Sequence, residues 1–404
     1  MVEWAGIERS RPFFSPKLWP RAAMQSAPYL VKLALMKKEN YSTDDRMFDW
    51  SHGVSALCVV ALAVVLGLGK VTPWISPIAI LFLGVSVMMA VHHAEVIALR
   101  VGPSLGALIL ALSVTVIEVG LIVSLMTNDT PDSLVVARDT VFSAVIIVTN
   151  GIMGICLLIG GIKFKELGFH AGGAGSLLSA LVVLSGLTLV LPNFTTSTIP
   201  GTYSTFQLIF VSIACLLLYF SLVFSQTVTH RDYYEPLSTQ KENELERTEY
   251  IPSKRRAWIS FAGLVLTLAV VIGLAKALSP SIEAGVAALG APRTIVGIVI
   301  ALLVLAPETW AAVSAARANQ LQTSLNLALG SGAASIALTV PVVSLFSIMT
   351  DRQLVLGLDG KGTVFLAMTF LTGGLTLAGG RATALTGIMH LSLLLAFLAF
   401  SFIP

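Results

Sequence analysis

About eleven runs of apolar residues, each long enough to cross a lipid bilayer, dominate this sequence of 404 residues. A transmembrane helix needs roughly 20 mostly apolar residues. Hydrophobic residues make up 55% of the chain and charged residues only 12%, whereas a soluble domain carries about a quarter charged residues. The runs are continuous rather than alternating, which excludes a transmembrane β-barrel. We therefore expect an all-α polytopic membrane protein with about eleven transmembrane helices.

The apolar runs define the predicted spans. They cover residues 51–69, 77–98, 103–126, 138–161, 174–191, 205–226, 257–279, 293–317, 323–349, 361–378 and 383–403. Residues 1–50 are polar and contain no apolar core of a signal peptide, so the first span is expected to direct insertion. The only other long polar segment, residues 227–256, divides the remaining chain into two halves.

The distribution of positive charge predicts the orientation in the membrane. Placing the N-terminus in the cytoplasm puts 19 of the 25 Lys and Arg residues on the cytoplasmic side. Cytoplasmic loops carry such an excess of positive charge. This favours a cytoplasmic N-terminus and a C-terminus on the opposite side. The basic residues are scattered rather than gathered in a stripe, so we expect no nucleic-acid partner, and the lipid bilayer is the expected surrounding.

Two acidic residues, Glu118 and Glu308, lie deep inside apolar runs, each about fifteen residues after the start of its run. A carboxylate in hydrocarbon is costly, so such residues usually mark an ion pathway or a proton relay. No Lys or Arg lies in either run except at its ends. The two acids are therefore the predicted site for a metal cation and for protons.

The two halves resemble each other around these acids. Glu95 lies 23 residues before Glu118, and Glu283 lies 25 residues before Glu308. A run rich in Gly, Ser, Thr or Asn follows each acidic run. This pattern predicts an internal repeat. The expected domains are residues 1–50 (cytoplasmic segment), 51–69 (leading helix), 77–226 (first five-helix repeat), 227–256 (cytoplasmic linker) and 257–404 (second five-helix repeat).

An odd number of spans in each repeat makes the two copies run in opposite directions. The two acids then lie at similar depths on antiparallel helices near the middle of the bilayer. Inverted repeats with a site at this depth are typical of secondary transporters.

The chemistry of such a pair favours exchange of ions. Burial disfavours the charged form of a carboxylate, and two facing carboxylates titrate as a coupled unit. A cation between them favours ionisation, so cations and protons compete for the same oxygens. Ca²⁺, Na⁺ and K⁺ prefer oxygen ligands. The predicted additional ligands are the side chains of Thr149, Asn150, Ser331 and Ser335. Carbonyl groups freed by Pro307 or Pro341 are further candidates.

Other polar residues in the apolar part of the chain have less specific roles. The matched positions of Glu95 and Glu283 suggest the mouths of a pathway, although a place near the lipid headgroups explains them equally well. His92 and His93 are predicted to pack at an interface or to relay protons, because no complete metal-binding motif surrounds them. We expect the protein to need no cofactor other than the transported ions.

The sequence resembles the calcium/cation antiporter superfamily, specifically the cation/proton exchanger family and its bacterial sodium-potassium/proton (calcium/proton) antiporter branch. The resemblance is carried by HHAEVIALRVGPSLGALILALSVTVIEV, ARDTVFSAVIIVTNGI, APRTIVGIVIALLVLAPE and NQLQTSLNLALGSGAASIALTVP. It covers roughly residues 50–403. It implies an eleven-span fold, with one leading helix and two inverted five-helix repeats, in a bacterial inner membrane. It also implies exchange of a cytoplasmic cation for external protons.

The resemblance also assigns roles to single residues. Glu118 and Glu308 match the cation-binding acids of the family's repeat motif, and Asn150 and Gly330-Ser331 match polar positions in the spans that follow. The Gly-Asn pairs that precede the acid in the family are absent. Two amide ligands are thus missing, which fits a less calcium-selective site that also takes Na⁺ or K⁺.

The predicted function is a secondary-active antiporter that exchanges cytoplasmic Ca²⁺ and/or Na⁺/K⁺ for external protons by alternating access, and not an enzyme. Two alternatives remain open. In the first, the paired glutamates are the general acid and base of an intramembrane enzyme. In the second, the protein is a passive cation channel, with no fixed ratio of ions to protons. The sequence leaves a homo-oligomer open.

Overall fold

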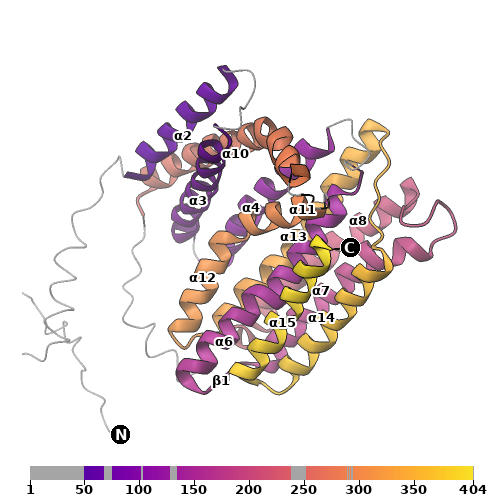
Figure 1. The fold of residues 1–404 in the computed structure, drawn as a ribbon. Coiled ribbons are helices and arrows are strands. Elements are labelled where there is room, and N and C mark those ends of the chain that lie inside the picture. Colours follow the sequence, from indigo (N-terminus) through magenta and orange to yellow (C-terminus); the bar gives the residue numbers. More distant parts are fainter. Residues whose placement is uncertain are drawn as a thin grey trace, which may run out of the picture. The chain divides into compact units, whose positions relative to one another are not determined.

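Figure 1 shows the helices of the computed structural model, which describes residues 50–67, 75–101, 103–127, 134–237, 252–288, 290, 292 and 294–403. The predicted N-terminal segment before residue 50 and the middle of the predicted linker, residues 238–251, lie outside the described residues. The helices are α2 (Trp50–Gly67), α3 (Ser76–Val101), α4 (Pro103–Met126), α5 (Val136–Ile146), η2 (Ile147–Ile152), α6 (Met153–Phe164), α7 (Ala171–Ser185), η3 (Gly186–Val190), η4 (Leu191–Phe194), α8 (Thr205–Phe224), η5 (Ser225–Thr229), η6 (Arg231–Tyr233), α10 (Lys254–Ala288), α11 (Thr294–Val304), α12 (Ala306–Arg317), α13 (Leu321–Thr350), α14 (Gly360–Ala378) and α15 (Ala384–Phe402). The strands are β1 (Glu166–Gly168) and β2 (Arg381–Thr383).

The lengths of these helices confirm an all-α polytopic membrane protein. In the described part of the chain, eight helices are long and apolar enough to cross a membrane, or nine if α11 and α12 form one bent span. The apolar helices Ser51–Gly67 and Leu112–Met126 are shorter. The number of eleven spans therefore stays a prediction.

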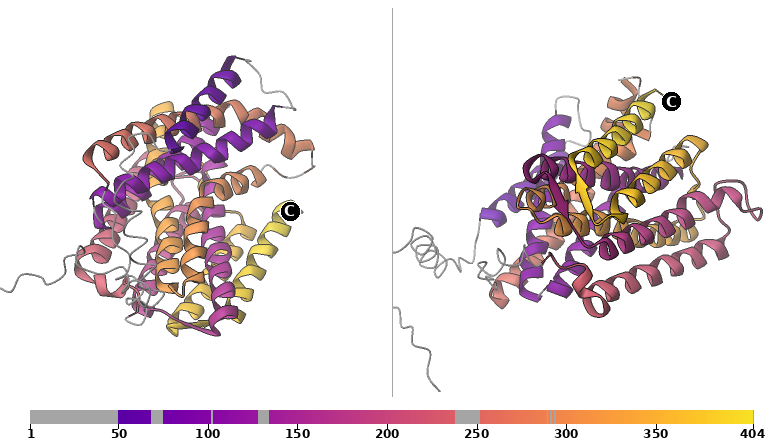
Figure 2. Two further views of the ribbon diagram at one scale, coloured as in Figure 1. Left: turned by 90° about the vertical axis from the view of Figure 1, so that its left-hand side faces the viewer. Right: turned by 90° about the horizontal axis from the view of Figure 1, so that it is seen from below.

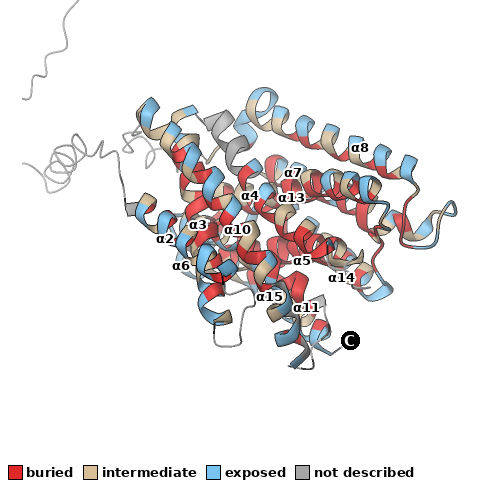
Figure 3. Cartoon of the chain, turned by 90° about the horizontal axis from the view of Figure 1, so that it is seen from above, coloured by how far each residue is buried: buried red, intermediate tan, exposed pale blue. Residues whose placement is uncertain are grey.

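Exposed apolar side chains mark the surface that faces lipid. On α8, Phe206 is 77% exposed and Phe210 is 61% exposed. Figure 3 shows the same pattern along this helix, whose outer side is pale blue and whose inner side is red. Such a surface is stable in a bilayer, because burial against lipid removes it from water.

Helix starts follow local sequence signals. α8 begins after a capping box, in which Ser204 Oγ accepts a hydrogen bond from the Gln207 amide and the Ser204 amide donates to Gln207 Oε1 at 2.9 Å. This arrangement satisfies amide groups that lack a partner inside the helix. In α14, the Asp359 carboxylate has the same effect, since it accepts from the Gly362 amide at 2.7 Å.

The helices of the two predicted repeats make reciprocal contacts. The first helices of the repeats, α3 and α10, pack against each other, and Figure 2 shows them side by side. α5 packs on α11, and in the opposite sense α13 packs on α4. Likewise α13 packs on α8, and α6 packs on α15. An inverted repeat produces this pattern, although the boundaries of the repeats stay a prediction.

A short β-ladder joins the two halves where α6 ends and α15 begins. β1 pairs antiparallel with β2, with Leu167 opposite Ala382. Next to it, Gly161 of α6 lies directly against the backbone of Ala384, so a Cβ atom has no room at this position. The ladder and the glycine contact hold the ends of α6 and α15 together.

Candidate functional site

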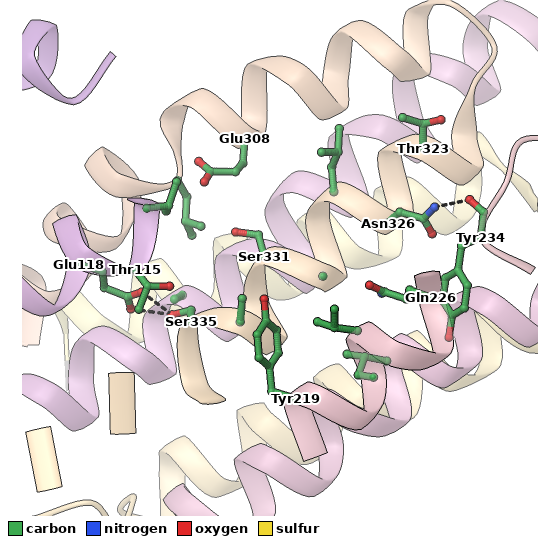
Figure 4. Close-up of a pocket in the computed structure, with 18 of the residues that line it drawn as sticks. Thr115, Glu118, Tyr219, Gln226, Tyr234, Glu308, Thr323, Asn326, Ser331 and Ser335 are labelled. Atoms are coloured by element: carbon green, nitrogen blue, oxygen red, sulfur yellow. Dashed lines mark hydrogen bonds between the residues drawn. The ribbon is translucent and has the colours of Figure 1, made fainter. Parts of the chain in front are cut away.

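Glu118 of α4 and Glu308 of α12 line the same cavity, which has a volume of about 390 Å³ (Figure 4). The two acids come from different halves of the chain and different sides of the cavity. Other polar residues of its wall are Thr115, Tyr219, Gln226, Thr227, Arg231, Tyr234, Glu235, Thr323, Asn326, Ser331 and Ser335. The predicted pairing of the two glutamates is therefore present in the structure.

Glu118 is buried and hydrogen-bonded. Only 4% of it is exposed. The hydroxyl of Ser335 donates to its carboxylate and lies 2.6 Å from Oε1 and 2.7 Å from Oε2. Ser335 belongs to α13, so this contact links the two predicted repeats. A hydrogen bond to an ionised carboxylate is roughly twice as strong as one between neutral groups.

Glu308 has a different environment. It lies in the first turn of α12, just after a bend of 56° between α11 and α12. Pro307 lacks an amide hydrogen, which favours a break in the helix at this point. The amide groups at the start of α12 favour a negative charge nearby. Among the described residues, no group donates a hydrogen bond to its buried Oε2 atom.

The other predicted acids lie outside the wall of this cavity. Glu95 is exposed on α3. Glu283 belongs to α10, and its side chain lies outside the described residues. The predicted pathway role of Glu95 is compatible with this position, but stays a prediction.

The cavity extends from the acids toward the end of the bundle where α8 ends and α13 begins, which we call the linker end. Asn326 and Thr323 line it there on the first turns of α13, as Figure 4 shows. The Asn326 amide donates to the carbonyl oxygen of Tyr234 at 2.6 Å. At the mouth, Arg231 pairs with Glu235 at 2.9 Å. The cavity thus connects the two acids to the linker end.

The structure brings only two of the four predicted additional ligands to the cavity, namely Ser331 and Ser335. Asn150 lies in η2 and is fully buried away from it. Its Nδ2 donates to the hydroxyl of Thr369 at 2.7 Å, and its Oδ1 lies 2.9 Å from Nδ1 of His390. Thr149, beside it, is also fully buried. In this conformation Asn150 therefore joins η2 to α14 and α15 and does not face the acids.

Of the adjacent histidines His92 and His93, the second lies at the contact between α3 and α2. His93 is fully buried, and its Nε2 lies 3.0 Å from the hydroxyl of Ser55 on α2. The rings of His52 and His93 are 5.3 Å apart. Neither His92 nor His93 lines the main cavity. Within the described ranges, no group of three or more His, Cys, Asp or Glu side chains has the arrangement of a metal site.

The comparisons with known proteins agree with this fold. The sequence profile described as "Sodium/calcium exchanger protein" matches residues 71–228 and 259–403. This chain belongs to the sodium/calcium exchanger protein family. The match also confirms the resemblance to the calcium/cation antiporter superfamily.

Individual relatives of this exchanger are similar over most of their length. The protein y4hA of Sinorhizobium fredii is 43% identical over 319 residues, which cover 79% of this chain and 86% of the relative. The sodium-potassium/proton antiporter ChaA of Escherichia coli is 34% identical over 314 residues, covering 78% and 84%. The crystal structure of the H⁺/Ca²⁺ exchanger CAX has a TM-score of 0.66 at 15% identity, covering 88% of this chain and 89% of that one. It shares the fold.

Several residues that line the cavity of this exchanger were not predicted from the sequence. Thr115 lies three residues before Glu118 and therefore on the same face of α4, a signal that could have identified it. Tyr219 of α8 and Gln226 of the following helix η5 also line the cavity. The membrane-spanning run of α8 contains no acidic residue, so nothing in the sequence marks that run as polar.

Proposed function

We propose that this exchanger is a secondary-active antiporter in which Glu118 and Glu308 bind either a cytoplasmic cation, Ca²⁺, Na⁺ or K⁺, or protons. The observation that carries this proposal is the position of two carboxylates from opposite halves of the chain around one cavity. Among the described residues, Arg231 is the one basic side chain in the wall of the cavity, and it pairs with Glu235 at the mouth. Within the part of the chain that the structure describes, no basic side chain compensates the charges of the two acids.

Two uncompensated carboxylates in a medium of low dielectric constant repel each other, and the doubly ionised empty state is costly. A cation or protons remove that cost. Because both bind to the same oxygens, release of one must accompany binding of the other, which couples the two fluxes. The helix break before Glu308 and the hydroxyls of Ser331 and Ser335 supply further ligands. The amide side chains of the wall, Gln226 and Asn326, lie toward the linker end, as Figure 4 shows. The set of ligands around the two acids therefore contains no amide oxygen, which favours a site that accepts Na⁺ and K⁺ as well as Ca²⁺.

The relatives support this choice of ions. ChaA is named as a sodium-potassium/proton antiporter, and a 25% identical protein of Aphanothece halophytica is named as a Ca²⁺/H⁺ antiporter. We place the protein in a bacterial inner membrane with its N-terminus in the cytoplasm. The linker end of the cavity then faces the cytoplasm, so the structure corresponds to a state that is open inward.

The test is a panel of ions on purified protein in liposomes that contain a pH-sensitive dye and carry an imposed pH gradient. Addition of Ca²⁺, Na⁺ or K⁺ is expected to dissipate the gradient, with a fixed ratio of cations to protons. Mg²⁺ and choline are the comparison cations. Cation conductance without proton movement would instead indicate a channel. Turnover of a lipid or peptide without ion flux would indicate an enzyme.

Ser335→Ala is expected to weaken cation binding while exchange is retained. The substitution removes the hydroxyl that donates to Glu118. A hydrogen bond to a charged group contributes roughly 1.5–3 kcal/mol, so KM for the cation should rise by about tenfold or more. The measurement is the initial rate of dye response against cation concentration. Ser392→Ala is the control, because that exposed hydroxyl donates to a carbonyl of its own helix. An unchanged KM in Ser335→Ala would contradict this role.

A further inference from the structure

The main cavity is larger than an inorganic cation needs. Its volume is about 390 Å³, whereas one water molecule occupies about 30 Å³ in the liquid. A cation with a shell of six waters therefore needs roughly 180 Å³, about half of this space. Cavities that bind small organic molecules have volumes of about 300–1,000 Å³. The main cavity thus has room for an organic ligand.

Apolar side chains separate the two acids from the polar linker end of this cavity. Leu222 and Val223 of α8 line it before the polar residue Gln226 of η5. On α13, Leu327 lines it one turn before Ser331. Pockets for small organic molecules have such walls, in which apolar side chains predominate and a few polar groups orient the ligand. This wall therefore fits a ligand with an apolar body and one charged group.

The inner end of the cavity favours a positive charge that carries hydrogen-bond donors. Among the described residues, no group donates to the buried Oε2 atom of Glu308, and no basic side chain lies beside the two acids. A buried polar atom without a partner is costly. A primary ammonium group, like that of lysine, carries three N–H donors. It can donate to both carboxylates at once. Choline, which has no N–H group, lacks this match.

We propose that the main cavity also binds a primary organic ammonium ion with an apolar body. The inference rests on the proposed function, because the ammonium group takes the place of the transported cation at Glu118 and Glu308. The apolar body lies along Leu222, Val223 and Leu327, toward the linker end. An organic ammonium ion and an inorganic cation therefore compete for the same two carboxylates.

The test is isothermal titration calorimetry on the purified full chain with methylammonium, butylammonium and hexylammonium. Titrations into the same detergent without protein are subtracted. Each CH₂ group that leaves water should strengthen binding by about three- to fourfold. Hexylammonium is therefore expected to bind at least about a hundredfold more tightly than methylammonium. Hexanol, which has the same chain without the charge, is the comparison ligand and should bind far more weakly. Ca²⁺ or Na⁺ should raise the apparent Kd of hexylammonium.

Gly330→Leu tests whether the apolar body lies in the cavity. Gly330 lines the cavity, and no atom lies within 4 Å of a Cβ built there, so a larger side chain fills open space. Binding of hexylammonium should weaken by about tenfold or more, because the leucine takes the space of its chain, while binding of methylammonium should change by less than about twofold. The matched control is Gly374→Leu, on an exposed position of α14 where a Cβ also meets no atom within 4 Å.

Binding of methylammonium also shows that the variant is folded. If Gly330→Leu loses both ligands, Gly330→Ala replaces it as the smaller change. Equal affinities for methylammonium and hexylammonium, or equal hexylammonium binding in the Gly330 and Gly374 variants, would overturn the proposal. Binding requires no transport. Exchange without hexylammonium binding counts only against this inference. Hexylammonium binding that inorganic cations displace, in a protein without exchange activity, supports it and counts only against the proposed antiport.

Discussion

Glu118→Gln and Glu308→Gln are each expected to abolish exchange, while the protein still inserts and folds. Glutamine has nearly the shape of glutamate but can neither release a proton nor carry a negative charge. Loss of one charged partner in a buried site costs roughly 3–5 kcal/mol, so the exchange rate should fall by at least about a hundredfold. Folding should be preserved, because a neutral amide is less costly to bury in a membrane than a carboxylate.

The measurement is the cation-driven pH change in proteoliposomes, with the amount of inserted protein determined in the same sample. Glu166→Gln is the matched control, since Glu166 is an exposed residue of β1 whose partner is Arg381. Its exchange should equal that of the unaltered protein. If both Glu118→Gln and Glu308→Gln kept their activity, the two acids would not be the transport site.

Gly161→Ala is expected to destabilise the folded protein. A Cβ atom at this position would overlap the backbone of Ala384, including its amide nitrogen, and backbone atoms cannot turn aside as a flexible side chain can. Overpacking of this kind costs about 1–3 kcal/mol or more. The result should be a lower melting temperature in detergent and a smaller monodisperse fraction on size exclusion.

Gly374→Ala is the matched control for this change. It also lies inside a membrane-spanning helix, α14, but no atom lies within 4 Å of a Cβ built there. Alanine is favoured over glycine in a helix by about 1 kcal/mol, so its melting temperature should stay the same or rise. Equal melting temperatures of Gly161→Ala and the unaltered protein would show that α6 and α15 can separate here without cost.

Hydropathy predicted most of the helices, because the hydrocarbon core leaves a chain few other structures. The run expected at 205–226 becomes α8 and η5, Thr205–Thr229. The pairing of Glu118 with Glu308 followed from the odd number of spans in each predicted repeat. Pro307, noted for the carbonyl that it frees, also marks the bend between α11 and α12.

The side of a helix that faces the cavity was harder to predict. Thr149 and Asn150 are expected as oxygen ligands because they lie in the polar span that follows the Glu118 run. They belong to the π-helix η2, however, whose wider turn changes the direction of side chains relative to an α-helix. The wall supplied by α8 and η5 was missed because Tyr219 and Gln226 carry no charge. Contacts between distant segments, such as that of Asn150 with His390, have no local signal in the sequence.

The β1–β2 ladder has a mechanical consequence. It fixes α15 at its first residues, whereas Phe397 and Phe400 lie near its last ones. A helix of 19 residues is roughly 28 Å long at 1.5 Å per residue. A tilt of α15 by about 5° about the ladder would move its last residues by roughly 2.4 Å over that length. This displacement is comparable to the diameter of an unhydrated ion. It leaves the β1–β2 ladder between the two halves unchanged.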